Sequence, residues 1–352
     1  MLPPRRATLA AALTALLPLR PASGQPVARP PPAPRSEWTG FKRLYMTDEG
    51  RVVDTANGGS SHSEGQGWAL LLAEAFNDEA AFNRILGWSR RVLRRPGDFL
   101  LAWGWRPNRA HPVEDLNNAT DGDVFMAWAL ERGARRWDRP ELLELAQRIA
   151  RDLHAACVRT VNGRHLLLPA AFGFEHRDHV VVNPSYYVMP AFGTLSRLQP
   201  EGRWDAVRRD GLALLREARF GRWGLPADWV RLPREGSTPP VPAPGWPPRF
   251  SYDAVRVPLY LAWAGLEDEP AAKAAIRFWD HAPQHVPAWT DVSQDSLAPY
   301  SANSGFQAIA SLLRDRGVTP ERLPRVADAP HYYAAALTLL ACLAADERPP
   351  AG

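Results

Sequence analysis

The sequence predicts an all-α protein, and three observations favour this fold class. Apolar residues recur at helical spacing over most of the chain, and strand-like alternation is confined to short pieces near 52–53, 166–168 and 180–182. Connections rich in Gly, Pro or Asp separate the helical segments. Short and long connections alternate, as in helix hairpins arranged around an axis. The predicted helices cover residues 64–76, 79–94, 123–137, 140–157, 185–197, 203–217, 253–266, 269–280, 303–314 and 330–346.

Periodicity alone also allows an α-solenoid, but the chain has no visible sequence repeat. One helical domain is therefore predicted over residues 37–348. Within it, residues 232–248 form a proline-rich loop that interrupts the helical pattern. This loop could line a cleft or be a plain surface insertion, and Trp246 is the residue in it that merits a test.

The chain begins with features of an exported protein. Residues 1–24 resemble a signal peptide, with two arginines, an apolar stretch at 7–19 and small residues at 22–24. The apolar stretch is shorter than the roughly 20 residues that span a membrane, so a retained anchor is the weaker interpretation. Sec and Tat export both remain open. Residues 25–36 are rich in proline and are expected to form an extended linker without a core.

The charge of the chain argues against anionic partners. The formal net charge is +4, and Arg5, Arg6 and Arg20 are the only charged side chains before residue 25, so removal of the leader leaves +1. A nearly neutral protein lacks the electrostatic attraction that nucleic acid or anionic lipid requires. We therefore expect an uncharged partner such as a neutral polysaccharide, no nucleic acid, and no stable membrane insertion after signal cleavage.

The two cysteines leave a disulfide open. An oxidising compartment would allow Cys157 and Cys342 to pair. Each lies in an apolar helical run, however, where a small buried hydrophobic residue is the preferred interpretation.

Three predicted helices begin with an acid in a turn flanked by glycine or aromatic residues. Glu64 lies in Ser-Glu-Gly-Gln-Gly, Asp121 in Ala-Thr-Asp-Gly-Asp, and Asp253 in Ser-Tyr-Asp-Ala-Val-Arg. A single acid at such a position is ordinarily a favourable first-turn residue. Three of them together indicate a cleft lined by carboxylates, and glycoside hydrolases use such carboxylates to cleave the glycosidic bond.

These segments resemble the motifs of glycoside hydrolase family 8, in the family's order. Further matches are Phe-Lys at 41–42, Glu-Gly-Arg-Val-Val-Asp at 49–54, Asn-Pro-Ser-Tyr at 183–186 and Pro-Ala-Asp-Trp-Val-Arg at 226–231. Within the family, the chain is most similar to the periplasmic cellulases encoded with bacterial cellulose synthase. The resemblance covers roughly residues 38–345 and implies an (α/α)6 toroid, with short β pieces in its loops.

The resemblance also implies the role of each acid. Glu64 resembles the general acid that protonates the leaving oxygen, and Asp253 the general base that activates water. Asp121 resembles the residue that holds the sugar hydroxyls and favours a distorted ring. Tyr186 is expected to help hold the attacking water. Family 8 enzymes invert configuration, so Glu64 and Asp253 should lie about 6.5–9.5 Å apart.

Each acid also has a purely structural interpretation. Ser63 and Gln66 could form a capping box around Glu64. Asp253 could pair with Arg256 one turn later, which would also keep a general base ionised. Glu64 needs a raised pKa to act as an acid, and a neighbouring carboxylate or burial against Trp68 or Trp103 could supply it.

The aromatic residues suggest where a polysaccharide binds. Fourteen tryptophans are many for this length, and exposed rings in a groove stack on sugars. Trp103, Trp105 and Trp229 lie in loop-like segments and are predicted to bind substrate, together with Tyr252 and Arg256 beside the base. Five others fall within helices and are expected in the core: Trp88, Trp128, Trp137, Trp263 and Trp279.

The leading prediction is a periplasmic or secreted, inverting endo-β-1,4-glucanase that acts on cellulose, with a cellulose synthase complex as its implied partner. The alternatives are another β-1,4-glycan (chitosan, xylan or mixed-linkage glucan) or a glucan-binding export component. No cofactor and no metal are expected. His176 and His179 have a spacing that could serve a metal, but without a partner motif a surface pair is preferred.

Overall fold

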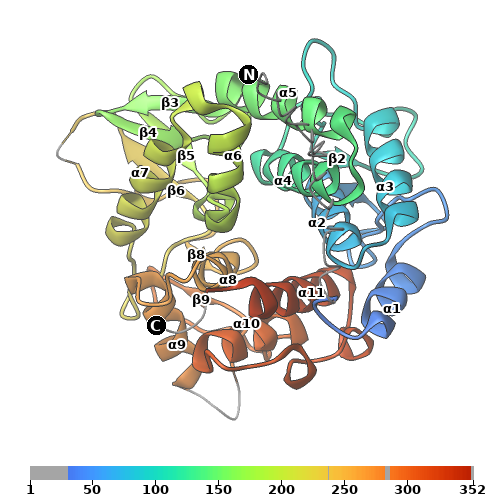
Figure 1. The fold of residues 1–352 in the computed structure, drawn as a ribbon. Helices are drawn as coiled ribbons and strands as arrows, with labels where there is room; N and C mark the ends of the chain where they lie inside the picture. Colours follow the sequence, from blue (N-terminus) through green and yellow to red (C-terminus); the bar gives the residue numbers. More distant parts are fainter. Residues whose placement is uncertain (1–30, 237, 282–285, 350–352) are drawn as a thin grey trace, which may run out of the picture.

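Eleven α-helices form the framework of the structure in a computed structural model that describes residues 31–349, except 237 and 282–285. Figure 1 shows them arranged as a ring around a central axis. The predicted all-α class is therefore confirmed. The helices are α1 (Arg35–Tyr45), α2 (Ser63–Ala75), α3 (Glu79–Val92), α4 (Thr120–Trp137), α5 (Pro140–Cys157), α6 (Phe192–Leu198), α7 (Trp204–Glu217), α8 (Arg256–Trp263), α9 (Pro270–Asp280), α10 (Ser304–Arg314) and α11 (Tyr332–Glu347).

Burial divides the helices into an inner and an outer layer. The inner helices α2, α4, α8 and α11 are buried over most of their length, and they contact one another in the order α4–α2–α11–α8. Helices α3, α5, α7 and α9 bury one apolar stripe against them and expose charged residues on the other face. The acidic motifs lie at or just before the beginnings of α2, α4 and α8, so they meet at one end of the ring.

Glycines allow α2 and α4 to approach each other closely at the ends that carry the acids. A Cβ on Gly122 would lie 2.8 Å from the backbone nitrogen of Glu64, and one on Gly67 would lie 2.9 Å from the carbonyl oxygen of Gly122. Neither atom fits unless the helices separate. The glycines of both motifs therefore place the two acidic helix starts side by side.

Short antiparallel strands occupy the connections between helices. They form the pairs β1–β2, β3–β4 and β8–β9 and the three-stranded order β5–β6–β7. The strands predicted near 166–168 and 180–182 are confirmed, whereas Val52 forms only an isolated bridge to Met46. The strands are β1 (Ser61–His62), β2 (Gly104–Trp105), β3 (Val158–Val161), β4 (Arg164–Leu167), β5 (His179–Val182), β6 (Val230–Pro233), β7 (Val241–Pro242), β8 (Arg249–Phe250) and β9 (Thr290–Asp291).

Two helix predictions are wrong in detail. In place of one helix over 185–197, the chain forms two 3-10 turns before α6, because Pro190 lacks the N–H group that the interior of an α-helix needs. The helix predicted from 253 begins at Arg256, and residues 252–255 form a turn.

The structure describes only the last residues, from 31 onwards, of the linker predicted over 25–36. Helix α1, which periodicity did not predict, begins at Arg35, and Ala33 just before it is buried. Trp38, Phe41 and Tyr45 anchor this helix in the core, because they recur at a spacing of three or four residues. Residues 1–30, which contain the predicted signal peptide, lie outside the described residues. None of the described helices has the length and apolar character needed to cross a membrane.

The two cysteines and the five tryptophans within helices are buried or partly buried, as their apolar helical surroundings predicted. Cys157 and Cys342 are buried free thiols, which agrees with the preferred interpretation over a disulfide. Of the five helical tryptophans, four are buried, and Trp137 is partly buried with its ring 4.8 Å from that of Phe82.

Candidate active site

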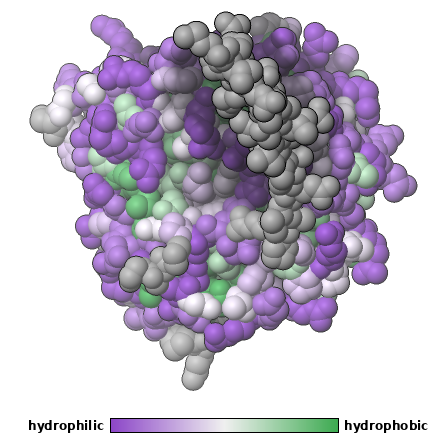
Figure 2. Space-filling model, viewed as in Figure 1, coloured by the Kyte–Doolittle hydropathy of each residue, from purple (hydrophilic) through white to green (hydrophobic). Residues whose placement is uncertain are grey.

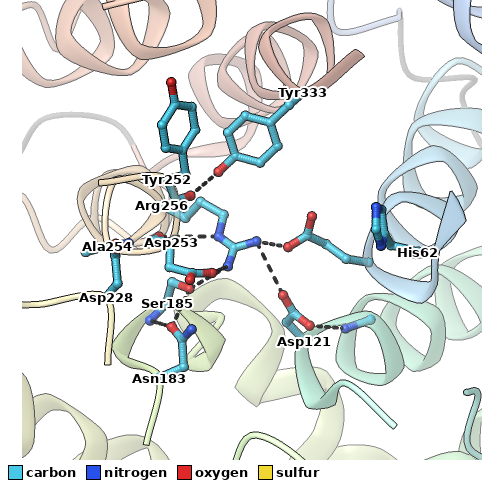
Figure 3. A network of polar contacts seen from close by, with 12 residues as sticks. His62, Asp121, Asn183, Ser185, Asp228, Tyr252, Asp253, Ala254, Arg256 and Tyr333 are labelled. Carbon is cyan, nitrogen blue, oxygen red and sulfur yellow. Dashed lines mark hydrogen bonds and ion pairs between the residues drawn. The ribbon is translucent and has the colours of Figure 1, made fainter. Parts of the chain in front are cut away.

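One buried arginine holds three carboxylates together where the inner helices begin (Figure 3). Arg256 is only 1 % exposed. Its Nη1 contacts the carboxylate of Glu64 and lies 3.4 Å from Oδ2 of Asp121, and its Nη2 lies 2.6 Å from Oδ1 of Asp253. The three acids predicted as catalytic, which are far apart in sequence, therefore share one positive charge.

The glycine-rich turn around Glu64 does not form the capping box that was the structural alternative. The amide of Gln66 points away from the turn: its Oε1 accepts from the backbone of Val52, and its Nε2 donates to Ser89 Oγ at 2.9 Å. Ser63 Oγ has no hydrogen-bond partner among the described residues. The carboxylate of Glu64 is thus free of local capping and reaches Arg256 instead.

Burial and neighbouring charges change the acidity of the other two carboxyls. Burial raises the pKa of Asp121 to about 7. The pKa of Asp253 is raised well above its ordinary value, first by burial and then by the negative charges of Asp228 and Asp121. Hydrogen bonding from Trp229 acts in the opposite direction. Asp253 is consequently a stronger base than an exposed aspartate.

A second layer of side chains fixes the arginine. Ser185 Oγ accepts a hydrogen bond from Arg256 Nη2 at 2.7 Å and donates one to Asn183 Oδ1 at 2.7 Å (Figure 3). The ring of Tyr186 lies 5.8 Å from the guanidinium carbon, and burial raises the pKa of its phenol well above 10, so it keeps its proton. Sequence reasoning noted this segment as a motif but missed Ser185 and Asn183 as supports of the arginine.

The predicted catalytic residues line a cavity of about 260 Å³. Figure 2 shows that this face of the molecule is largely hydrophilic and hollowed towards its centre. An open polar depression of this kind suits a hydroxyl-rich ligand. The cavity is lined by Asp54, Asn57, His62, Glu64, Trp103, Ala119, Asp121, Tyr186, Tyr252, Asp253, Arg256, Tyr332 and Tyr333.

A larger cavity of about 550 Å³ continues the depression past Trp103 and Trp105. The two cavities share Asn57, His62 and Trp103, so together they form one groove. Trp103 stacks on the His62 ring at 6.1 Å and donates from Nε1 to Asp115 at 2.9 Å. These contacts fix the indole in the groove wall, as its predicted role requires.

Tyrosines form another part of the wall, where Tyr252 and Tyr333 lie beside Arg256 (Figure 3). Tyr252, which was predicted to bind substrate, is 40 % exposed. Its hydroxyl lies 3.4 Å from that of Tyr300, which also accepts from Trp289 Nε1 at 3.0 Å. Sequence reasoning missed Tyr300 and Trp289 because they lie in an irregular segment without a motif.

Trp229 is engaged with other aromatic rings of the protein. Its indole stacks on Phe174 at 5.5 Å and on Trp246 at 5.0 Å, and it meets Tyr186 edge-on at 6.2 Å. Trp246 belongs to the proline-rich loop, so this loop supports the wall of the site. That contact brings one residue of the loop close to the site, although no residue of the loop lines the cavity that holds the acids.

Replacing Trp246 by alanine is expected to lower kcat/KM on a soluble glucan about 2- to 10-fold, because a stacked aromatic pair contributes about 0.5–1.5 kcal/mol. Trp229 would lose a ring that holds it beside Asp253 and Tyr186. Steady-state kinetics measure the effect. Val241→Ala in the same loop, where Val241 is exposed, is the control and should leave kcat/KM unchanged. Equal values for the two variants would exclude a role for the stack.

The histidine pair considered as a metal site is a stacked surface pair. The rings of His176 and His179 lie 4.3 Å apart, and His179 Nδ1 contacts Asp178 at 2.8 Å. Among the described residues, no group of three or more His, Cys, Asp or Glu side chains is arranged to hold a metal ion.

Comparisons with known proteins agree with one another. The model of the family "Glycosyl hydrolases family 8" matches residues 3–347. The chain is 40 % identical over 320 residues to a "Probable endoglucanase" of Novacetimonas hansenii, covering 90 % of this chain and 92 % of that protein. It is 36 % identical to an "Endoglucanase" of Cellulomonas uda, covering 82 % and 80 %.

A solved structure shows the same architecture. The endo-beta-1,4-glucanase CMCax from Acetobacter xylinum superposes with a TM-score of 0.84 at 40 % identity, covering 89 % of this chain and 97 % of that one. The fold predicted from the motifs, an (α/α)6 toroid, is confirmed by this likeness.

Proposed function

Because this chain belongs to glycosyl hydrolase family 8 and is an endo-β-1,4-glucanase, we propose that its substrate is cellulose and that it hydrolyses the chain with inversion. The observation that carries the proposal is the cluster of Glu64, Asp121 and Asp253 on one buried arginine, in an open groove with aromatic walls. Such a groove accepts a long chain at any point, as internal cleavage requires.

In the proposed mechanism, two carboxyl groups act on opposite sides of the scissile bond. Glu64 protonates the departing glycosidic oxygen, and Asp253 takes a proton from the water that attacks the anomeric carbon. The proton removed from water remains on Asp253, while the one from Glu64 leaves with the released chain end. Both groups return to their starting states through solvent.

Asp121 and Tyr186 assist this reaction in our proposal. Asp121 Oδ2 has no hydrogen-bond partner among the described residues, although it faces Arg256, and we assign it to a hydroxyl of the sugar at the cleavage point. Tyr186 keeps its phenolic proton and can hold the attacking water in line with the bond. An inverting reaction requires about 6.5–9.5 Å between the acid and the base.

The aromatic residues along the groove are proposed as binding sites for glucosyl units. Trp103 and Trp105 would serve one side of the cleavage point and Tyr252 the other. Trp229 and Arg256 are assigned supporting contacts beside the base, since both are held mainly by other groups of the protein.

Cellulose is preferred over other β-1,4-glycans. The relatives at 36–40 % identity carry endoglucanase names. A beta-1,3-1,4-glucanase from Paenibacillus sp. X4 is only 15 % identical to this chain, and a reducing-end-xylose releasing exo-oligoxylanase is only 16 % identical, so these likenesses show the fold alone. We further propose export through the predicted leader and a role beside a cellulose synthase. The second candidate class, a glucan-binding export component, is disfavoured because all three acids are present and meet in one cleft.

The deciding experiment incubates the protein from Gln25 onwards with carboxymethyl cellulose, chitosan, xylan and mixed-linkage glucan. We expect new reducing ends from the cellulose derivative, with Asp253→Asn as the inactive control. Proton NMR of cello-oligosaccharide products should show the α-anomer first, because inversion of a β-bond gives it directly. Activity only on another polymer would correct the substrate. Binding of cello-oligosaccharides without any turnover would support the export component.

A further inference from the structure

Asp228 is a buried carboxylate directly behind the turn that carries Asp253. It is 8 % exposed and lies two residues before β6. Its backbone N–H donates to the carbonyl oxygen of Arg249 at 2.7 Å, which ties it to β8. The residue is therefore anchored on a strand framework and is independent of the helix that follows the turn.

The side chain of Asp228 binds the backbone of that turn. Oδ1 accepts from the amides of Ser251 at 3.0 Å and Ala254 at 2.7 Å, and Oδ2 accepts from the Ser251 hydroxyl. Helix α8 has no side-chain cap from its own N-cap residue, Val255. The Asp228 carboxylate instead holds the turn that precedes the helix, because it accepts two backbone amides on either side of Asp253. It thereby sets the direction in which Asp253 leaves the backbone.

The charge of Asp228 is not neutralised by its neighbours. Its donors in the described part of the chain are backbone amides and one hydroxyl, whereas Arg256 is occupied by the three other acids. Burial raises the pKa of Asp228 to about 6. After burial, Asp228 is the largest cause of the raised pKa of Asp253.

We propose that Asp228 is a positioning residue for the general base, holding the turn under Asp253 and placing a second negative charge behind it. This inference rests on the proposed function, because it assigns Asp228 to the same hydrolytic reaction. A general base works best when its pKa lies near the working pH, so a neighbouring negative charge strengthens it. The two carboxyl groups titrate as a coupled pair.

Other charged or titratable side chains also face Asp228 and Asp253, and none of them is substituted in the variants described below. They come from α4, the 3-10 turn after Asn183, α8 and α11. The charged or titratable groups are Asp121, Tyr186, Arg256, Tyr260 and Tyr333, with Glu64 on the far side of Arg256.

The test is the pH profile of kcat/KM for Asp228→Asn. Removing the negative charge lowers the pKa of Asp253, so the base stays deprotonated at lower pH. The acid limb should therefore move down by about 1 pH unit, the lower end of the effect of a neighbouring charge. At the plateau kcat should fall about 3- to 10-fold, because a base that is one pKa unit weaker slows proton transfer by at most a factor of about ten. KM should change little.

Three variants separate charge, position and stability. Asp228→Glu keeps the charge but displaces the turn, so kcat should fall while the acid limb stays in place. Ser251→Ala keeps the charge and loses one hydrogen bond, and it too should leave the limb in place. Asp123→Asn is the matched control. Burial raises the pKa of the Asp123 carboxyl to about 7, and this carboxyl accepts a hydrogen bond from the backbone amide of Leu101, not from the turn that carries Asp253.

An unshifted acid limb in Asp228→Asn, or the same shift in Asp123→Asn, would overturn the proposal. If Asp228→Asn does not fold, Asp228→Glu decides. Full activity of Asp228→Glu would overturn the positioning role, whereas a reduced kcat with the acid limb of the wild type would support it. Turnover by the wild type on the same substrate tests the proposed function separately. A negative result with an active wild type therefore concerns Asp228 alone.

Discussion

Glu64→Gln is expected to lower the turnover of carboxymethyl cellulose about 10²- to 10⁴-fold, the usual contribution of a general acid. Glutamine has nearly the same shape but cannot transfer a proton to the leaving oxygen. Binding of cello-oligosaccharides should survive, because Arg256 still holds Asp121 and Asp253 in the groove. Steady-state kinetics and calorimetric titration measure the two effects on one sample.

A substrate with a good leaving group makes this test specific for proton transfer. A dinitrophenyl β-cello-oligosaccharide needs no protonation, so Glu64→Gln should lose much less activity on it. Glu74→Gln is the matched control, since Glu74 lies on the same helix and pairs with Arg132 at 2.5 Å. It should lower stability and leave kcat unchanged. Equal losses of Glu64→Gln on both substrates would instead indicate that Glu64 acts only through Arg256.

The meeting of three acids in one place could be predicted from sequence because local rules and motif order both pointed to them. Glu64 and Asp121 lie in the first turns of α2 and α4, where helical periodicity and glycine mark the start. The close approach at Gly67 and Gly122 explains why glycine accompanies both acids. Periodicity likewise predicted most of the helical ring, because each outer helix buries a regular apolar stripe.

The support of the acids could not be predicted, because it depends on contacts between distant segments. Asp228 binds a turn 23 to 26 residues later in the chain, and Ser185 reaches Arg256 across 71 residues. Neither contact leaves a periodic signal. The segment 185–197 was mistaken for a helix because its apolar spacing is helical, whereas Pro190 within it removes a backbone N–H group that a continuous helix needs.

Arg256 was predicted as the partner of one aspartate, yet three carboxylates share it. The i, i+3 spacing to Asp253 is visible in the sequence, but the contacts with Glu64 and Asp121 require the ring of helices to close. A single guanidinium thus sets the relative positions of the proposed acid, the proposed base and the aspartate proposed to bind the sugar. This convergence makes it the side chain whose loss should affect both stability and chemistry.

Arg256→Met is expected to lower the free energy of unfolding by about 3–5 kcal/mol near neutral pH, the usual cost of leaving a buried charge without its partner. It should also lower kcat about 10³-fold or more, because the three carboxylates repel one another and lose their arrangement. Arg256→Lys keeps the charge but lacks the planar fork, so it should recover stability better than activity.

The stability loss in Arg256→Met should grow with pH. Without the guanidinium, the pKa values of Asp121 and Asp253 in the folded protein rise further above those in the unfolded chain. A carboxyl with a raised folded pKa binds more protons when folded, so stability falls as pH increases from about 4 through the folded pKa. For Asp121 that value is already about 7 with the arginine present. Thermal unfolding at pH 5 and pH 8 measures the difference between variant and wild type.

Arg132→Met is the control, because Arg132 is largely buried, with its side chain 12 % exposed, and bridges two carboxylates, Glu74 at 2.5 Å and Glu347 at 2.7 Å. It lies near the end of α2 opposite to Glu64, so it should lose stability while folded enzyme keeps its kcat. A comparable loss of kcat in both variants would show that Arg256 acts through general stability. Loss of kcat in Arg256→Met alone would establish that one cation organises the carboxylates that carry the reaction.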